Sequence, residues 1–142
     1  GKDVPSYEEL LTSRDRLLAR HPKTRFIFCH LSNQGHDTAA LARALDKFPN
    51  LYLDIAARDY ELGRQPRAAF QFLVRYQDRV MFGTDMGMEQ RMYEGWWRLL
   101  ETADEYLPGR IWWPYYGLEL PDNLLKSLYR ENALKLLNWT KP

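Results

Sequence analysis

The stretch RFIFCHL, residues 25–31, is apolar without polar alternation until it ends in His30 and Leu31. Such a run is typical of a strand that is buried on both faces, as in a parallel sheet. Two later stretches have the same character: LYLDI at residues 51–55 and RVMFGTD at residues 79–85. We therefore predict three buried strands, each with a polar side chain at or near its carboxyl end.

Helical patterns separate these strands along the chain. A helix is expected to open at Ser6, which forms a capping box with Glu9, and to stop at Pro22. Pro66 fits the first turn of another helix. Further helices are expected over residues 38–48, 67–76, 89–106, 124–129 and 130–137. Strands that alternate with helices imply right-handed crossovers and a parallel sheet, so the fold class is α/β.

Length and composition bound the answer further. The 142 residues suffice for one domain with a core, so we expect a single domain over residues 1–142. Lys and Arg number 20 against 19 Asp and Glu, which gives no electrostatic reason to expect nucleic acid or an anionic membrane as partner. The single Cys29 excludes an internal disulfide and fits a reducing compartment, so a cytoplasmic location is expected. We interpret Cys29 as a small apolar packing residue.

The polar strand ends are the candidate site. In parallel α/β folds, ligands and chemistry gather at the carboxyl edge of the sheet, where His30, Asp54 and Asp85 are expected to meet. A neutral imidazole and a carboxylate suit a divalent metal, with zinc as the expected ion, and Asp85 could also take a proton from a metal-bound water. Structural explanations compete: His30 could bond to backbone, Asp85 could cap its loop, and Asp54 could be a hydrogen-bond acceptor.

Several motifs, in this order, carry a resemblance to a known family: FCHL ending at Leu31, YLD ending at Asp54, FGTD ending at Asp85, and Glu131-Asn132-Ala133 near the C-terminus. Together they resemble the final strands and helix of the amidohydrolase-related branch of the amidohydrolase superfamily. That branch contains metal-dependent hydrolases and some decarboxylases on a (β/α)8 barrel, also called a TIM barrel. The resemblance covers nearly the whole chain.

The resemblance implies a fold and roles for individual residues. It implies a partial (β/α)8 barrel, with three parallel strands equivalent to strands 6–8 and flanking helices. His30 is similar to the histidine that contacts the metal, its water or the substrate, and Asp85 to the aspartate that binds the metal and shuttles the proton. His30 and Asp85 are thus the expected catalytic and metal residues. Arg58, Arg64 and His36, in the loops, are the candidates for substrate binding, the arginines through bidentate contacts to an anionic group.

The departures from the family pattern limit what this chain is expected to do. The His-x-His pair of the family's first strand is absent, since the histidines are His21, His30 and His36. A whole barrel needs about 250 residues. The chain is therefore expected to be the C-terminal half of the barrel, with at most two metal ligands, fewer than a zinc site of three or four protein ligands needs. Alone, it is expected to be nearly inactive.

Three strands would also leave two unpaired sheet edges, so a homo-oligomer through these edges is expected. The expected activity of the whole enzyme is hydrolysis of a small carbonyl, ester or amide substrate by a metal-activated water. A decarboxylase of the same superfamily and a non-enzymatic α/β interaction module remain as alternatives. A flavodoxin-like doubly wound domain is a weaker one, because no glycine-rich phosphate loop is present.

Overall fold

A three-stranded parallel sheet forms the centre of the protein, as predicted. The computed structural model describes residues 3–109 and 111–139. The strands are β1 (Phe26–Phe28), β2 (Leu51–Asp54) and β3 (Val80–Met81), in the order β1-β2-β3. Both neighbouring pairs are parallel. All three strand carboxyl ends therefore lie at one edge of the sheet, which confirms the α/β class and the expected arrangement of the polar strand ends.

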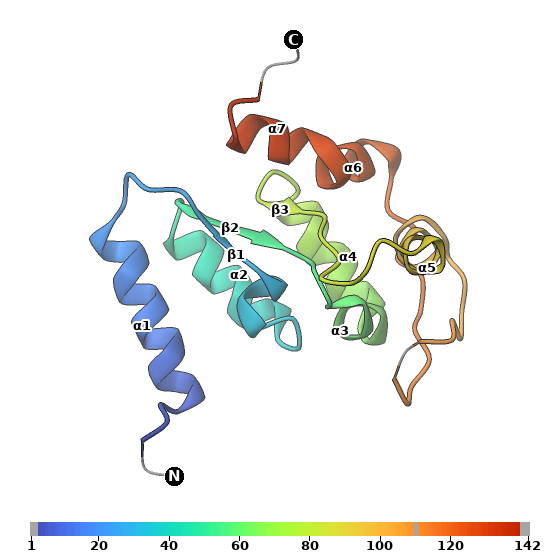
Figure 1. Ribbon diagram of the computed structural model, residues 1–142, viewed down its shortest axis with the longest axis horizontal. Coiled ribbons are helices and arrows are strands. Elements are labelled where there is room, and N and C mark those ends of the chain that lie inside the picture. The colour runs from blue at the N-terminus through green and yellow to red at the C-terminus, as the bar shows by residue number, and fades with distance from the viewer. Residues whose placement is uncertain (1–2, 110, 140–142) are drawn as a thin grey trace.

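Helices surround this sheet, with α1 at one end of the molecule and α5 at the other (Figure 1). Most lie where the sequence predicts them, and the additional helix α3 occupies a segment predicted as loop. In chain order the helical segments are α1 (Tyr7–Arg20), the short turn η1 (His30–Asn33), α2 (Thr38–Lys47), α3 (Asp59–Arg64), α4 (Pro66–Arg75), α5 (Gln90–Glu101), α6 (Asp122–Lys126), the π-helical η2 (Ser127–Glu131) and α7 (Asn132–Leu136).

Local capping explains where the helices begin. At α1, the Ser6 hydroxyl accepts from the Glu9 N–H at 3.2 Å, and the Glu9 carboxylate accepts from the Ser6 N–H at 2.7 Å. This is the predicted capping box. At α2, the Asp37 carboxylate accepts from the Ala40 N–H at 2.8 Å. Pro66 occupies the first turn of α4, where its missing N–H costs nothing.

The helix predicted over residues 89–106 is wrong at its end, because α5 stops at Glu101. The reason lies far along the chain. The backbone N–H groups of Leu118 and Leu120 donate to the carbonyls of Leu99 and Leu100, at 2.8 and 2.9 Å. The segment around Leu118 and Leu120, which has no regular secondary structure, thus donates to carbonyls that a helix leaves free at its C-terminus. No local pattern in residues 89–106 contains that information.

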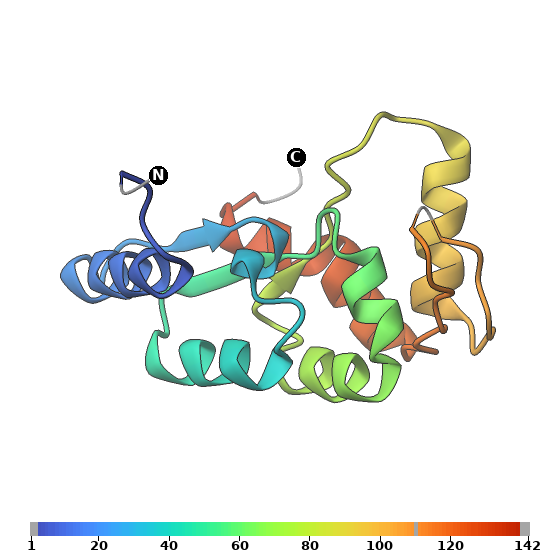
Figure 2. The same cartoon turned by 90° about the horizontal axis from the view of Figure 1, so that it is seen from below.

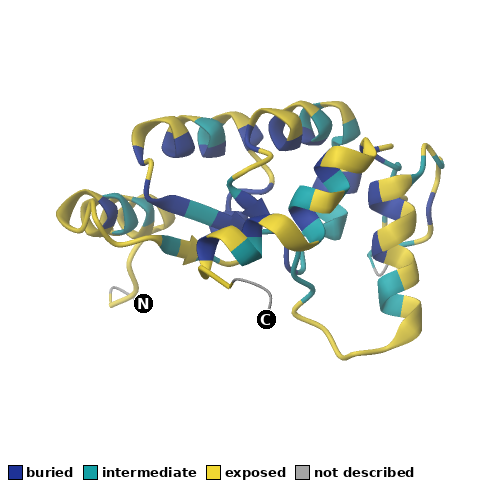
Figure 3. Cartoon of the chain, turned by 90° about the horizontal axis from the view of Figure 1, so that it is seen from above, coloured by how far each residue is buried: buried dark blue, intermediate teal, exposed yellow. Residues whose placement is uncertain are grey.

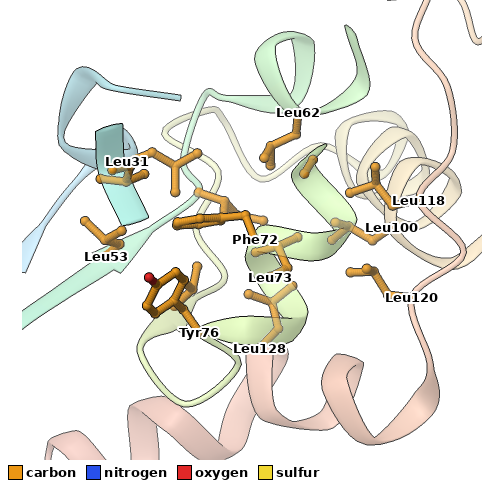
Figure 4. Close-up of a cluster of buried hydrophobic side chains, with 14 of the residues drawn as sticks. Leu31, Leu53, Leu62, Phe72, Leu73, Tyr76, Leu100, Leu118, Leu120 and Leu128 are labelled. Carbon is orange, nitrogen blue, oxygen red and sulfur yellow. The ribbon is translucent and has the colours of Figure 1, made fainter. Parts of the chain in front are cut away.

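One face of the sheet is covered by α2 and α4, which lie side by side along it (Figure 2). The apolar faces of both helices are buried and their outer faces exposed (Figure 3). Leu53 of β2 belongs to the same buried cluster as Phe72 and Leu73 of α4 and Tyr76, the residue that follows α4 (Figure 4). The core continues from there through Leu62 to residues of α5 and the C-terminal segment.

The opposite face of the sheet is more open, so the prediction that the first strand is buried on both faces is wrong. Ile27 and Tyr52 are paired in register, so their side chains share this face. Ile27 keeps 44% of its surface exposed, and Tyr52 is only half-buried. Among the described residues, β1 pairs with β2 alone, so its outer edge carries no ladder partner.

The C-terminal helices are anchored at β3. The Asn132 amide donates to the carbonyls of Gln77 and Val80, at 2.6 and 2.8 Å, and the Phe82 N–H donates to the Leu128 carbonyl at 2.9 Å. These bonds join both ends of β3 to the segment from α6 to α7, which runs on without the break predicted near residue 130. Within residues 3–109 and 111–139, no helix has both the length and the apolar character to cross a membrane.

Candidate functional site at the carboxyl edge of the sheet

His30 and Asp85 meet at the carboxyl edge of the sheet. His30 follows β1 and Asp85 follows β3, and the His30 Nε2 lies 3.7 Å from the Asp85 Oδ2. The two side chains are 30% and 62% exposed. This distance is too long for a direct hydrogen bond. Both groups therefore face a shared, solvent-accessible space, and the structure brings together the two residues that the sequence pairs as catalytic and metal-binding.

The backbone that presents His30 is strained. His30, Leu31, Ser32 and Asn33 all have positive φ, between 50° and 58°. This conformation is unfavourable for residues other than glycine, at about 1–2 kcal/mol each. The turn also ends the strand earlier than the predicted residue 31, because left-handed residues cannot continue a ladder. Strain of this kind persists only when surrounding contacts hold it, and it clusters at functional sites.

Arg58 is the main brace of this turn. Its Nε donates to the His30 carbonyl at 3.0 Å, and its two terminal nitrogens donate to the Asn33 Oδ1 and the Tyr60 hydroxyl, both at 2.6 Å. The Glu61 carboxylate lies 3.7 Å from the same Nε. The guanidinium predicted to bind substrate is thus engaged with the protein's own groups. Its observed contacts make it an organiser of the His30 turn.

The imidazole of His30 is fixed by backbone. Its Nδ1 lies 2.8 Å from the Ala56 carbonyl oxygen, which can only accept a hydrogen bond. In the neutral ring, Nδ1 therefore carries the proton and Nε2 carries the lone pair. The same peptide unit donates from the Ala57 N–H to the Thr84 carbonyl at 3.1 Å. One peptide of the loop after β2 thus links His30 to the segment that carries Asp85.

Asp54 and Cys29 complete the edge. The Asp54 Oδ1 accepts from the backbone N–H groups of His30 and Ala56, at 2.8 and 3.0 Å. Cys29 is exposed, which corrects its interpretation as a buried packing residue. The turn beginning at His30 places the thiol beside Asp54. A hydrogen bond to the Asp54 carboxylate, with partial burial and the nearby charges of Asp54 and Asp85, raises the pKa of the Cys29 thiol.

The other two predicted substrate residues, His36 and Arg64, line a neighbouring cavity of about 320 Å³. Its remaining lining residues are Tyr60, Glu61, Gln65 and Trp113. The Arg64 guanidinium stacks on the Trp113 ring, with its carbon 4.7 Å from the ring centroid. The Trp113 indole in turn donates to the Tyr60 carbonyl at 3.4 Å. Glu61 connects this cavity to Arg58, and hence to the His30 turn.

Sequence reasoning missed Tyr60 and Trp113 as cavity residues. The interpretation of Asp54 as a hydrogen-bond acceptor is confirmed, although its two backbone partners were not predicted. For Asp54 a signal existed, since a carboxylate at a parallel strand end lies beside the neighbouring strand's last N–H groups. For Trp113 none existed, because 53 residues separate it from Tyr60.

A divalent metal fits this edge only in part. A neutral imidazole with a free Nε2 and an adjacent carboxylate are suitable zinc donors, and a backbone carbonyl on the other ring nitrogen is a common orienting partner. The number of donors is too small, however. Among residues 3–109 and 111–139, no group of three or more His, Cys, Asp or Glu side chains is placed to hold a metal ion. His30 and Asp85 would give at most two ligands, whereas a zinc site needs three or four.

An α/β domain with a histidine and an aspartate at the carboxyl edge of one parallel sheet, after β1 and β3, defines a class of protein in which chemistry takes place at the sheet edge. Comparison with known families assigns the chain within that class. The model of the amidohydrolase family matches residues 8–139, and the chain belongs to this family. Neither the curated proteins nor the solved structures yield a significant match. Membership of this family indicates an enzyme of the hydrolase type.

Proposed function

We propose that this chain supplies one part of the active site of a metal-dependent hydrolase, in which His30 and Asp85 are two of the metal ligands. The observation that carries the proposal is the 3.7 Å separation of the His30 Nε2 and the Asp85 Oδ2, with both side chains facing the same accessible space. A lone pair on Nε2 and a carboxylate oxygen at this spacing suit two donors to one ion.

The remaining ligands would come from polypeptide that pairs with the open sheet. The chain would then be the strand 6–8 part of a (β/α)8 barrel, and the exposed face of Ile27 and Tyr52 would turn toward the barrel interior. When bound, a divalent ion, zinc in our proposal, would lower the pKa of a water so that its deprotonated form could attack a carbonyl carbon. Asp85, the more exposed of the pair, would be the carboxylate that accepts the proton from that water.

The cavity beside the His30 turn is our proposed substrate subsite. Arg64 is exposed, and its guanidinium forms no hydrogen bond or ion pair with another described residue. The guanidinium donors are therefore available while the Trp113 ring holds their plane. His36 adds a second nitrogen donor to the same cavity. This combination suits a small carbonyl, ester or amide substrate that carries a planar group and a carboxylate or phosphate. Arg58 would act on the substrate indirectly, through the turn it braces.

Metal binding to the chain tests the proposal directly. We would titrate Co²⁺ into the protein and follow the paramagnetic effects on His30 and Asp85 by NMR. Because two ligands form an incomplete site, we expect weak binding at one position. His30→Ala and Asp85→Asn should each weaken it at least about tenfold. His21→Ala is the matched control, since this exposed histidine lies near the opposite end of β1. Equal loss in His21→Ala and His30→Ala would show that binding is nonspecific and refute the proposal.

Activity provides a second test, with zinc added to the chain and simple esters or lactones as substrates. We expect no turnover above the buffer with zinc, since two ligands do not complete the site. Robust turnover that disappears in Asp85→Asn would contradict the view that this chain carries only part of the active site.

A further inference from the structure

Asp54 ends the central strand β2, between the strands that precede His30 and Asp85. One of its carboxylate oxygens, Oδ1, accepts two backbone N–H groups, that of His30 at 2.8 Å and that of Ala56 at 3.0 Å. Hydrogen bonds to an ionised acceptor are about twice as strong as neutral ones. Asp54 thereby fixes the first left-handed residue after β1 and the loop after β2 relative to each other.

The two residues whose N–H groups donate to Asp54, His30 and Ala56, also share a hydrogen bond with each other. The His30 ring points its Nδ1 at the Ala56 carbonyl, 2.8 Å away. Through the His30 N–H, Asp54 fixes the backbone from which the imidazole projects. Through the Ala56 N–H, it fixes the residue whose carbonyl receives the ring proton. The acceptor and the ring thus owe their alignment to the same carboxylate oxygen.

Asp85 exerts the opposite preference on the ring. Its carboxylate lies on the Nε2 side and would favour a proton on Nε2. At 3.7 Å it is outside hydrogen-bond range, whereas the Ala56 carbonyl at 2.8 Å is within it. Moving the proton to Nε2 would place the Nδ1 lone pair against the carbonyl lone pairs. The shorter contact, from Nδ1 to the Ala56 carbonyl, therefore decides which ring nitrogen carries the proton. It persists only while the loop after β2 keeps its position.

We infer that Asp54 is a positioning residue that holds neutral His30 in its Nδ1–H tautomer, so that the Nε2 lone pair faces Asp85. The consequence for metal binding rests on the proposed function. The tautomer itself does not, because it exists and can be measured in the metal-free chain. Asp54 contacts neither of the proposed ligand atoms, and it acts through two backbone groups.

Nitrogen-15 NMR of the His30 ring tests this inference, since the chemical shifts of Nδ1 and Nε2 distinguish the two tautomers. The spectra are recorded without metal, at a pH where they show the ring to be neutral. In the unaltered chain we expect the Nδ1–H form to exceed the other at least about tenfold, the ratio that one net hydrogen bond of about 1.4 kcal/mol supports. A ring that is mainly Nε2–H would overturn the inference without any variant.

Three variants then separate the contributions. Asp54→Ala removes the acceptor and should give a mixture with both forms well populated. Asp54→Asn retains an Oδ1 acceptor of the same shape and should preserve the Nδ1–H form. Asp85→Asn removes the competing charge and should leave the tautomer unchanged. If Asp54→Ala kept the original ratio, or if Asp85→Asn alone changed it, Asp54 would not be the residue that sets the tautomer.

The outcome is separable from that of the proposed function. An Nδ1–H ring that depends on Asp54, in a chain that binds Co²⁺ no better than its His30→Ala variant, would support the positioning role and refute the metal site. If Co²⁺ binding remained site-specific in Asp54→Ala and the tautomer of His30 were also unchanged, the metal site would be supported and the positioning role of Asp54 refuted. Amide spectra of each variant confirm that the fold is retained. If Asp54→Ala does not fold, the tautomer of the unaltered chain and its response to Asp85→Asn still test the inference, because a mainly Nε2–H ring or a change in Asp85→Asn would overturn it.

Discussion

Removing the Arg58 side chain should release the strained turn that carries His30. Arg58→Ala deletes three hydrogen bonds from a charged donor, and the side chain that makes them is only 16% exposed. Each such bond contributes about 1.5–3 kcal/mol, but the Asn33 amide is exposed and can bond to water instead. Glu61 also loses its cation. We therefore expect a loss of about 3 kcal/mol in the free energy of unfolding.

A matched control is available in Arg64→Ala. This arginine is exposed, and its contact with Trp113 contributes about 0.5–1 kcal/mol. With an unfolding entropy of about 2.1 cal/mol/K per residue, 142 residues give about 0.3 kcal/mol/K. The midpoint of thermal unfolding should then fall by about 10 °C in Arg58→Ala and by about 3 °C in Arg64→Ala. Arg58→Lys should lie between them, because a single ammonium cannot reach all three acceptors.

The measurement is urea and thermal unfolding at one protein concentration, followed by tryptophan fluorescence. Amide hydrogen exchange of Ser32 and Gln34 adds a local readout, since both donate within the turn, at 3.0 and 2.9 Å. Their exchange should accelerate in Arg58→Ala before the rest of the chain is affected. If the two alanine variants differ by less than about 0.5 kcal/mol, and these amides stay protected, Arg58 does not hold the turn.

Three further predictions concern the rest of the molecule. Gly63→Ala should destabilise the protein by about 1–3 kcal/mol, because a Cβ there would lie 2.7 Å from the Cβ of Tyr115. In Gly95→Ala, within α5, the new Cβ meets nothing within 4 Å, so this variant should be about 0.5–1 kcal/mol more stable. Urea titrations that rank the two variants the other way would contradict this packing. Burial, the hydrogen bond to Glu101 and the negative charge of Glu101 raise the pKa of Tyr129 in the folded state. The stability that this tyrosine contributes is thus present below about pH 10, where unfolded tyrosine ionises, and is lost as the pH rises further. Between about pH 9 and pH 11, Tyr129→Phe should therefore lose less stability than the unaltered chain. Parallel profiles of stability against pH would refute the raised pKa of Tyr129. The open edge of β1 and the exposed sheet face should make the chain self-associate, which size-exclusion chromatography with light scattering would detect, and a stable monomer at high concentration would count against it.

The sequence by itself determined the three strands, most of the helices and their order, but not helix α3. Apolar runs without alternation marked the three strands, and the capping box at Ser6 and the proline at position 66 marked helix starts correctly. Because parallel strands share one carboxyl edge, the sequence also brought His30 and Asp85 to the same place. These features depend on side-chain periodicity and on residues within a few positions of each other, which the sequence displays directly.

Only the tertiary structure decided how the site is built. The left-handed turn from His30 to Asn33 is held by Asp54 and Arg58, which lie more than 20 residues further along the chain. The end of α5 is set by Leu118 and Leu120, and the ring of His30 by a carbonyl of the next strand's loop. The physical reason is common to all three. A backbone group is satisfied by whichever partner the fold brings within about 3 Å, and that choice is made by packing between distant segments.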